Sequence, residues 1–545
     1  MSSPATAVPR APRLLALRRV SAGTLVAAGL VAVVCAVPVA YLFVVILDEP
    51  AVAWDVIWRA DTLSLLLRSL ALAVAVGATA TLVAVPLAWL TSRSDLPWRR
   101  GWTILSVLPL VIPSYIGAYL FVSALGPRGE LQGLLGVERL PSVYGFGGAW
   151  IVLTLFTFPL VLLPVRAALR RLDPNLEEAA AGMGRSQATI ARTVILPQLV
   201  PAIGAGALLV SLYALADFGA VSILRFDSFT RVIYQSYRAS FDRTGAAALA
   251  GVLVIVMLLL LVAESRLRRR RSYHRVGPGS IRAARPVPLG RWRWPALAYC
   301  ATVAFFSFLL PVGMLVYWSA QSVAGSTDWQ QVLTAAANSF LLAALTALVA
   351  AVAALPVAWL GARAPGRLSR LVDTLTTSGY ALPGIVVALA VVFVGIRLVP
   401  FLYQTLPMTV IAMVIVCLPL AITATRAAVL QLPPRLEEAA RGSGRSPAQV
   451  LATIGIPLTR AGILAGAALV FVAAIKELPV VVLLSPIGFS TLPLVIWQES
   501  TPLIVAISLI FPVPPAARLP APSPAVVRGR GWPRSRRRRA WIPAR

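Results

Sequence analysis

Long apolar stretches alternate with short polar segments along almost the whole chain. Each stretch comes close to or exceeds the roughly 20 apolar residues that a helix needs to cross the hydrocarbon core of a bilayer. The stretches centre on residues 22–47, 63–90, 102–125, 147–169, 200–224, 246–263, 295–318, 338–360, 374–398, 406–430 and 460–484. A twelfth candidate at 502–512 is short, because the prolines at and after its end should stop a helix. The pattern predicts an all-α, polytopic membrane protein.

The composition agrees with this prediction and disfavours another class of protein. Of the 545 residues, 59% are hydrophobic and 13% are charged, which is too apolar for a soluble globular protein. The net charge of +29 could attract nucleic acid, but the arginines lie between the apolar stretches and at both termini. Membrane topology explains that placement better. We therefore expect a lipid bilayer around the chain and no nucleic-acid partner.

The placement of arginine also predicts an orientation. Positively charged segments tend to stay on the cytoplasmic side of a membrane. The N-terminal segment 1–21 and the basic linker 266–294 are rich in arginine, as are the loops that contain Arg93 and Arg166. We expect a multi-pass protein of the plasma or inner membrane with a cytoplasmic N-terminus. Segment 225–245 is the exception, because it carries four arginines on the predicted outer side.

The chain contains an internal repeat. Five residues recur 270 positions later, where Ser69, Pro86, Trp89, Arg93 and Pro113 match Ser339, Pro356, Trp359, Arg363 and Pro383. After one gap the offset becomes 260, which pairs residues 176–180 with 436–440 and Pro197 with Pro457. Each half then holds about six spans in the same orientation, which indicates a parallel duplication. We expect the two domains at 22–265 and 295–512.

The polar segment between the fourth and fifth spans of each half carries the same motif. It reads LEEAAAGMGRSQATIARTVILPQ from Leu176 and LEEAARGSGRSPAQVLATIGIPL from Leu436. Two short helices joined by a glycine turn would form a compact knob that suits a groove on a partner. Both copies, at 176–197 and 436–457, resemble the EAA loop of importers in the ATP-binding cassette superfamily. The matching residues are Glu178, Ala179, Ala180, Gly184, Leu196 and Pro197, and then Glu438, Ala439, Ala440, Gly444, Ile454 and Pro457.

This resemblance implies a fold and a set of partners. It implies two tandem homologous permease domains of approximately six helices each, of the binding-protein-dependent importer (MetI-like) type. The two loops would be coupling helices, each docking on one of two copies of an ABC ATPase subunit. The only lysine, Lys476, does not follow a glycine-rich loop, so ATP cannot be held here by a P-loop. We expect no cofactor in this chain, ATP hydrolysis on the partner subunits, and no enzymatic activity of its own.

A second resemblance concerns the cargo. The stretches that begin at Pro141, Ala214 and Ala474 are similar to the corresponding parts of fused ferric-iron permeases. This implies ferric iron handed over by an extracytoplasmic binding protein that docks on the outer loops at 127–150 and 225–244. An importer of the same class for thiamine, phosphonate, sulfate or polyamine is the alternative. A secondary transporter of the major facilitator type is disfavoured, because the residues from Thr91 do not fit its basic loop motif and such a carrier has no use for two coupling loops.

Three ionisable residues lie at or near the ends of the fifth spans. Asp217 matches Glu477 by the repeat offset, and Lys476 precedes Glu477. Ionisable side chains at membrane depth are costly, and they mark either a pathway or a pairing within the bundle. Two interpretations therefore stay open. The carboxylates shape the passage of a cation or form part of a gate, or Lys476 and Glu477 form a buried pair, with Asp217 hydrogen-bonded nearby, that holds two helices in register.

The remaining chemistry is sparse. The three cysteines, Cys35, Cys300 and Cys417, lie in apolar stretches, and His274 is the only histidine, so no metal site is expected within the chain. Residues 513–545 are rich in proline and arginine and depart from the repeat. We expect this tail to be disordered, and we hypothesise that a frameshift replaced the natural end of the last span.

Overall fold

The computed structural model describes residues 21–126, 132, 136, 142–172, 174–238, 240, 242–270, 286–322, 329–377, 379 and 382–498. Within these residues the chain is helical, and the only β-bridge is an isolated one between Ser94 and Val287. Nine of the described helices are long and apolar enough to cross a membrane. A tenth span counts if Arg99–Val111 and Ser114–Leu125 form one bent unit. The structure therefore confirms the prediction of an all-α polytopic protein.

The first half of the chain consists of helices and short helical turns. They are α2 (Ala22–Asp48), α3 (Pro50–Trp58), α4 (Ala60–Arg93), α5 (Arg99–Val107), the 3₁₀ turn η1 (Leu108–Val111), α6 (Ser114–Leu125), α8 (Phe146–Thr157), α9 (Pro159–Arg171), α10 (Pro174–Gly182), α11 (Gln187–Ile190), the π-helical turn η2 (Ala191–Ile195), α12 (Leu196–Ala216), α13 (Gly219–Ile223), α14 (Phe229–Arg238) and α15 (Arg243–Arg270).

The helices of the second half repeat this order. They are η3 (Gly290–Trp292), α16 (Arg293–Ala304), the π-helical turn η4 (Phe305–Leu309), α17 (Leu310–Ser322), α18 (Trp329–Arg363), α19 (Arg367–Thr377), α20 (Gly384–Arg397), η6 (Pro400–Leu402), α21 (Leu406–Gln431), α22 (Pro434–Gly442), α23 (Pro447–Val450), the π-helical turn η7 (Leu451–Gly455), α24 (Ile456–Ala474), α25 (Pro479–Leu484) and α26 (Leu492–Gln498). The twelfth candidate span, at 502–512, and the tail at 513–545 lie outside the described residues.

The structure breaks the helix within each of the predicted spans 102–125 and 374–398. In the first half the chain bends by 95° between η1 and α6. Ile112, immediately before Pro113, is extended, with φ −80° and ψ 119°. The proline ring clashes with the preceding residue in the helical conformation and so forces this break. The second half breaks at the matching place, where α19 ends at Thr377 and α20 begins after Pro383.

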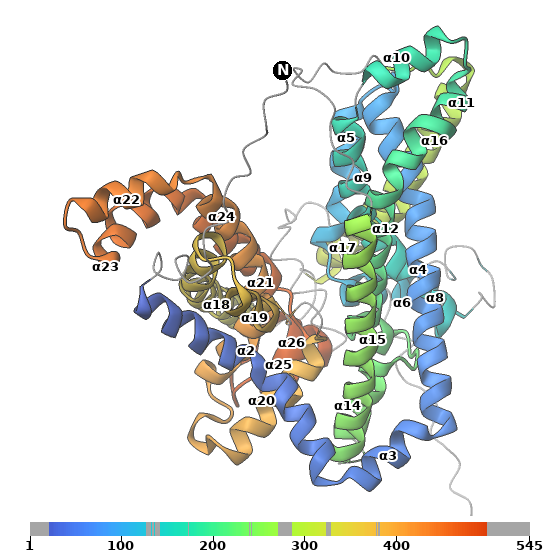
Figure 1. Cartoon of the computed structure of the whole chain (residues 1–545). Helices are drawn as coiled ribbons and strands as arrows, with labels where there is room; N and C mark the ends of the chain where they lie inside the picture. The colour runs from blue at the N-terminus through green and yellow to red at the C-terminus, as the bar shows by residue number, and fades with distance from the viewer. Residues whose placement is uncertain are drawn as a thin grey trace, which may run out of the picture.

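The two halves exchange their first helices. Helix α2 packs against α18, α19 and α20 of the second half, and Figure 1 shows it lying beside them. In return, α16 and η4 pack against α4 and α5 of the first half. Each of the three cysteines is buried and unpaired. The halves are thus interlocked by their first helices.

Candidate functional site

Both predicted coupling loops form the same helix–turn–helix. In the first half, α10 is followed by a turn and α11, and in the second half α22 is followed by a turn and α23. The turns contain Gly184 and Gly444, whose φ values of +76° and +82° lie in the left-handed region that favours glycine. Figure 1 shows each loop projecting at one end of its half. The shared geometry extends the sequence repeat to the backbone.

The motif residues divide into an exposed set and a buried one. Ala180 and Ala440 are buried and anchor the knob, at 3% and 7% exposure. All but one of the other matched positions are exposed, namely Glu178, Ala179, Gly184, Leu196, Pro197, Glu438, Ala439, Gly444 and Pro457, and Ile454 is partly buried. The exposed glutamates and small residues form a surface that nothing in the described part of the chain covers.

The prolines of the motif explain a local distortion. Pro197 follows the π-helical turn η2, and Pro457 follows η7. A proline has no N–H to donate to the carbonyl four residues earlier, so the pattern of backbone hydrogen bonds in the preceding turn changes. The side chain of Gln198 supplies a donor nearby, since its Nε2 lies 2.9 Å from the carbonyl oxygen of Val194. The result in each half is a widened turn between the coupling loop and the fifth span.

Sequence reasoning overlooked the first glutamate of each motif. Nη2 of Arg93, the last residue of α4, lies 3.0 Å from Oε1 of Glu177. Nη2 of Arg363, the last residue of α18, lies 2.7 Å from Oε1 of Glu437. Burial raises the pKa of Glu177 above its ordinary value, and the guanidinium of Arg93 opposes that shift. The signal was present in the sequence, because an arginine and a glutamate recur at matching positions of both halves.

A cavity of about 670 Å³ lies between the halves. It is lined by the ends of the two fifth spans, α12 and α24, and by the breaks after Pro113 and before Gly384. All three residues predicted at a translocation pathway, Asp217, Lys476 and Glu477, line it. The structure thus brings together side chains that are 260 positions apart in the sequence.

Asp217 is buried and fully engaged by hydrogen bonds. Its Oδ2 accepts from the hydroxyl of Ser114, and its Oδ1 accepts from the backbone N–H groups of Ala220, at 2.9 Å, and Val221, at 3.3 Å. The backbone carbonyl of Asp217 accepts from Oγ1 of Thr230 at 2.5 Å. These donors compensate for the loss of water around the carboxylate. They hold it at the cavity wall, between the end of α12 and the start of α13.

Glu477 occupies the equivalent place in the second half with a different neighbour. By the repeat offset of 270, Gly384 stands where the first half has Ser114. A Cβ at Gly384 would overlap Oε1 of Glu477, so glycine provides the room for the longer carboxylate. Each half therefore places one carboxylate at the cavity. In the first half a serine donates a hydrogen bond to an aspartate, and in the second half a glycine leaves room for a glutamate.

Lys476 does not contact Glu477 as an ion pair, which was one of the two interpretations left open by the sequence. Its Nζ donates instead to the backbone carbonyl of Leu110 in η1 of the first half, at 3.2 Å, and no ion-pair contact joins it to Glu477. The carbonyl is accessible because η1 lies at the break before Pro113, where helical hydrogen bonding stops. Lys476 therefore connects the second half to the first beside the cavity.

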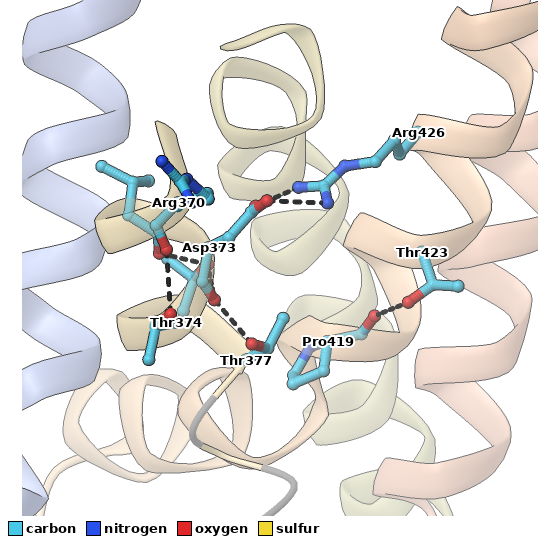
Figure 2. Close-up of polar contacts among 9 residues, drawn as sticks. Arg370, Asp373, Thr374, Thr377, Pro419, Thr423 and Arg426 are labelled. Atoms are coloured by element: carbon cyan, nitrogen blue, oxygen red, sulfur yellow. Dashed lines mark hydrogen bonds and ion pairs between the residues drawn. The ribbon is translucent and has the colours of Figure 1, made fainter. Parts of the chain in front are cut away.

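The second half also holds an ion pair that has no counterpart among the described residues of the first half. Nη1 of Arg426 on α21 lies 2.9 Å from Oδ2 of Asp373 on α19, and Figure 2 shows the two side chains facing each other between these helices. Oγ1 of Thr377, a cavity residue, donates to the carbonyl of Asp373 at 2.6 Å. By the repeat offset of 260, Arg166 is the first-half equivalent of Arg426. The Nη1 of Arg166 is buried and has no hydrogen-bond partner among the described residues. The end of α19 is thus fixed beside the cavity in one half only.

Comparison with known proteins adds an independent line of observation. Residues 80–273 and 352–514 both match the family described as binding-protein-dependent transport system inner membrane component. The Fe(3+)-transport system permease protein FbpB 2 of Haemophilus influenzae is 32% identical to this chain, over 82% of this chain and 86% of that protein. The ferric transport system permease protein FbpB of Actinobacillus pleuropneumoniae is 25% identical, over 76% of this chain and 64% of that protein. The molybdenum transport system permease protein ModB of Escherichia coli is 30% identical, but over only 30% of this chain and 69% of that protein.

Proposed function

This chain belongs to the family of binding-protein-dependent transport system inner membrane components, and on that premise we propose that it is the permease subunit through which an ATP-driven importer takes up ferric iron. The observation that carries the cargo assignment is the similarity to a Fe(3+)-transport permease along both halves of the chain. The domain matches at 80–273 and 352–514 agree with the predicted tandem arrangement of two permease domains. The chain is a multi-pass membrane protein.

Permeases of this class work with an ATPase and a substrate-binding protein. Two copies of the ATPase would dock, one on each coupling loop, through the exposed Glu178 and Glu438. The matching geometry of the two loops supports this stoichiometry, because each offers the same exposed surface. ATP would be bound and hydrolysed on those subunits, and the loops, with the N-terminus, would face the cytoplasm.

The cavity between the halves supports a cationic cargo. Two carboxylates, Asp217 and Glu477, and one cation, Lys476, line it. The acidic groups outnumber the basic one, and an excess of negative charge in a pathway favours a cation over an anion. Asp217 keeps its place through neutral donors rather than through a basic side chain. These residues would form part of the pathway for ferric iron that is delivered by an extracytoplasmic binding protein.

An oxyanion importer is the second candidate, favoured by the similarity to a molybdenum permease. That similarity reaches only 30% of this chain. The two carboxylates in the cavity oppose it, since they outnumber the single cation, Lys476, that an oxyanion would meet there.

The test is ATP-dependent uptake in proteoliposomes that contain this chain, its cognate ATPase and its cognate binding protein. Radiolabelled ferric iron, molybdate and sulfate are offered separately, and the variant Glu178→Arg/Glu438→Arg serves as the uncoupled control. We expect iron uptake that needs ATP and is lost in the control. Uptake of an oxyanion in place of iron would refute the cargo assignment. Iron uptake that persists in the control would refute the role of the loops.

A further inference from the structure

A buried ion pair ties each coupling loop to the second span of its half. Arg93 and Glu177 have side chains that are 7% and 22% exposed, and Arg363 and Glu437 have side chains that are 9% and 4% exposed. A buried ion pair is not by itself a strong source of stability, since desolvation offsets much of the attraction. Its recurrence at matching positions of both halves therefore calls for a further explanation.

Each guanidinium also binds the end of a third helix. Nη2 of Arg93 donates to the carbonyl of Leu169 in α9 at 2.9 Å. Nη2 of Arg363 donates to the carbonyl of Leu432 at the end of α21 at 3.0 Å. The planar fork of arginine can hold two acceptors at once in a fixed geometry. One side chain per half therefore joins the second span, the fourth span and the coupling helix.

The linked spans lead to the cavity. Helix α4 packs against α12, which ends at Asp217, and α18 packs against α24, which ends shortly before Glu477. The neighbouring residues Glu178 and Glu438 point outward, since adjacent residues on a helix lie about 100° apart. Of the two successive glutamates in each motif, the first faces the protein and the second faces a partner.

We propose that the pairs Arg93–Glu177 and Arg363–Glu437 transmit the movement of the docked coupling helices to the spans that line the cavity. This inference rests on the proposed function, in which the loops dock on the ATPase. The four residues are positioning residues, because their side chains are largely buried and none of them lines the cavity. Their loss would leave docking and ATP hydrolysis in place while ATP hydrolysis no longer drives uptake.

The experiment compares two matched variants of the full chain, Glu177→Gln/Glu437→Gln and Glu178→Gln/Glu438→Gln. The substitution is the same and the positions are adjacent, so only the direction of the side chain differs. The readouts are co-purification with the cognate ATPase, ATP hydrolysis, and the number of iron ions taken up per ATP hydrolysed. We expect the 177/437 variant to co-purify and hydrolyse ATP, with uptake per ATP reduced by about tenfold, within the usual range of coupling between sites. We expect the 178/438 variant to lose co-purification.

An unchanged ratio of uptake to hydrolysis in the 177/437 variant would overturn the inference, whatever its effect on thermal stability. If that variant does not fold, Arg93→Lys/Arg363→Lys serves instead, because lysine keeps the charge but lacks the fork that reaches the second carbonyl. A reduced ratio in this variant supports the inference and a wild-type ratio overturns it. If the wild-type chain itself fails to co-purify with the ATPase, the proposed docking fails first, and the inference falls with it.

Discussion

Gly384 leaves the space that the carboxylate of Glu477 occupies at the wall of the central cavity. The first half solves the same problem differently, with Ser114 donating a hydrogen bond to the shorter side chain of Asp217. The neighbour and the acid have therefore changed together between the halves. The volume and hydrogen bonding at this site are matched within each half, and this makes the pairing open to a direct test.

Gly384→Ala should reduce iron uptake, because the added methyl group would displace the Glu477 carboxylate. The atom displaced is the end of a flexible side chain, so the loss of stability should be smaller than the about 1–3 kcal/mol of ordinary core overpacking. Gly313→Ala in α17 is the control, since a Cβ there would meet no atom within 4 Å. Thermal unfolding in detergent and uptake in proteoliposomes check both variants. Equal uptake by the two variants would contradict the prediction.

The double variant Gly384→Ser/Glu477→Asp should recover part of the uptake that Gly384→Ser loses. It recreates in the second half the pairing of Ser114 with Asp217, in which the hydroxyl binds the shorter acid. A double-mutant cycle on uptake measures the interaction between the two positions. Additive effects would show that the two positions act independently.

Asp217→Asn and Asp217→Ala should separate charge from structure. The amide oxygen of asparagine can still accept the backbone N–H groups of Ala220 and Val221, so this variant should unfold at nearly the wild-type temperature. Alanine leaves those donors unpaired and should destabilise the protein by about 1–3 kcal/mol. If the charge serves the pathway, both variants lose uptake. Wild-type uptake by the asparagine variant would assign Asp217 a purely structural role.

Asp373→Asn should destabilise the second half by about 1–3 kcal/mol, because Arg426 loses a partly buried ionic partner. The Nε of Arg426 already has no hydrogen-bond partner, so nothing in the described residues compensates. Asp55→Asn is the matched control, since its ion pair with Arg59 is 65% and 58% exposed. Such surface pairs contribute about 0–1 kcal/mol. Thermal unfolding should show a clear shift for the first variant and almost none for the second.

Pro457→Ala should make the chain more stable and the importer less effective. Alanine restores the N–H that the ladder lacks, so the widened turn η7 can become α-helical, with a gain of about 1–3 kcal/mol. An α-helical turn holds one residue fewer than the π-helical turn that it replaces. The conversion would therefore rotate the coupling loop by about 100° relative to α24. Pro38→Ala in α2 is the control, because Pro38 lies inside a continuous α-helix. Higher stability with unchanged uptake would argue against a role for the turn.

Hydropathy predicted where the helices lie along the sequence but not which prolines break them. Pro38, Pro86 and Pro356 sit inside continuous helices, whereas the chain breaks at Pro113 and Pro383. An apolar count treats these prolines alike, because the outcome depends on what satisfies the freed backbone groups. At the first break Lys476 binds the carbonyl of Leu110, and that contact comes from 366 residues away. Only the folded chain shows it.

For the candidate site, the sequence predicted which residues are equivalent but not which contacts they make. The repeat offset placed Asp217 and Glu477 at equivalent positions, and the structure places them on one cavity. It could not decide whether Lys476 faces Glu477 or the other half, because both lie within reach of a flexible side chain. Glu177 and Glu437 were overlooked because the E-A-A pattern begins at the second glutamate, Glu178 or Glu438. Burial, which the sequence does not display, is what distinguishes the two glutamates.

The exchange of first helices bears on how the protein is made. During synthesis α2 enters the bilayer long before α18 and α19, its packing partners, have been translated. Likewise, the faces of α4 and α5 that α16 covers stay open until the second half begins. The linker between the halves then acts as a tether, because it turns the search for these partners into an intramolecular one at high effective concentration. Joining the two domains in one chain thus gives an interlocked pair a reliable route of assembly.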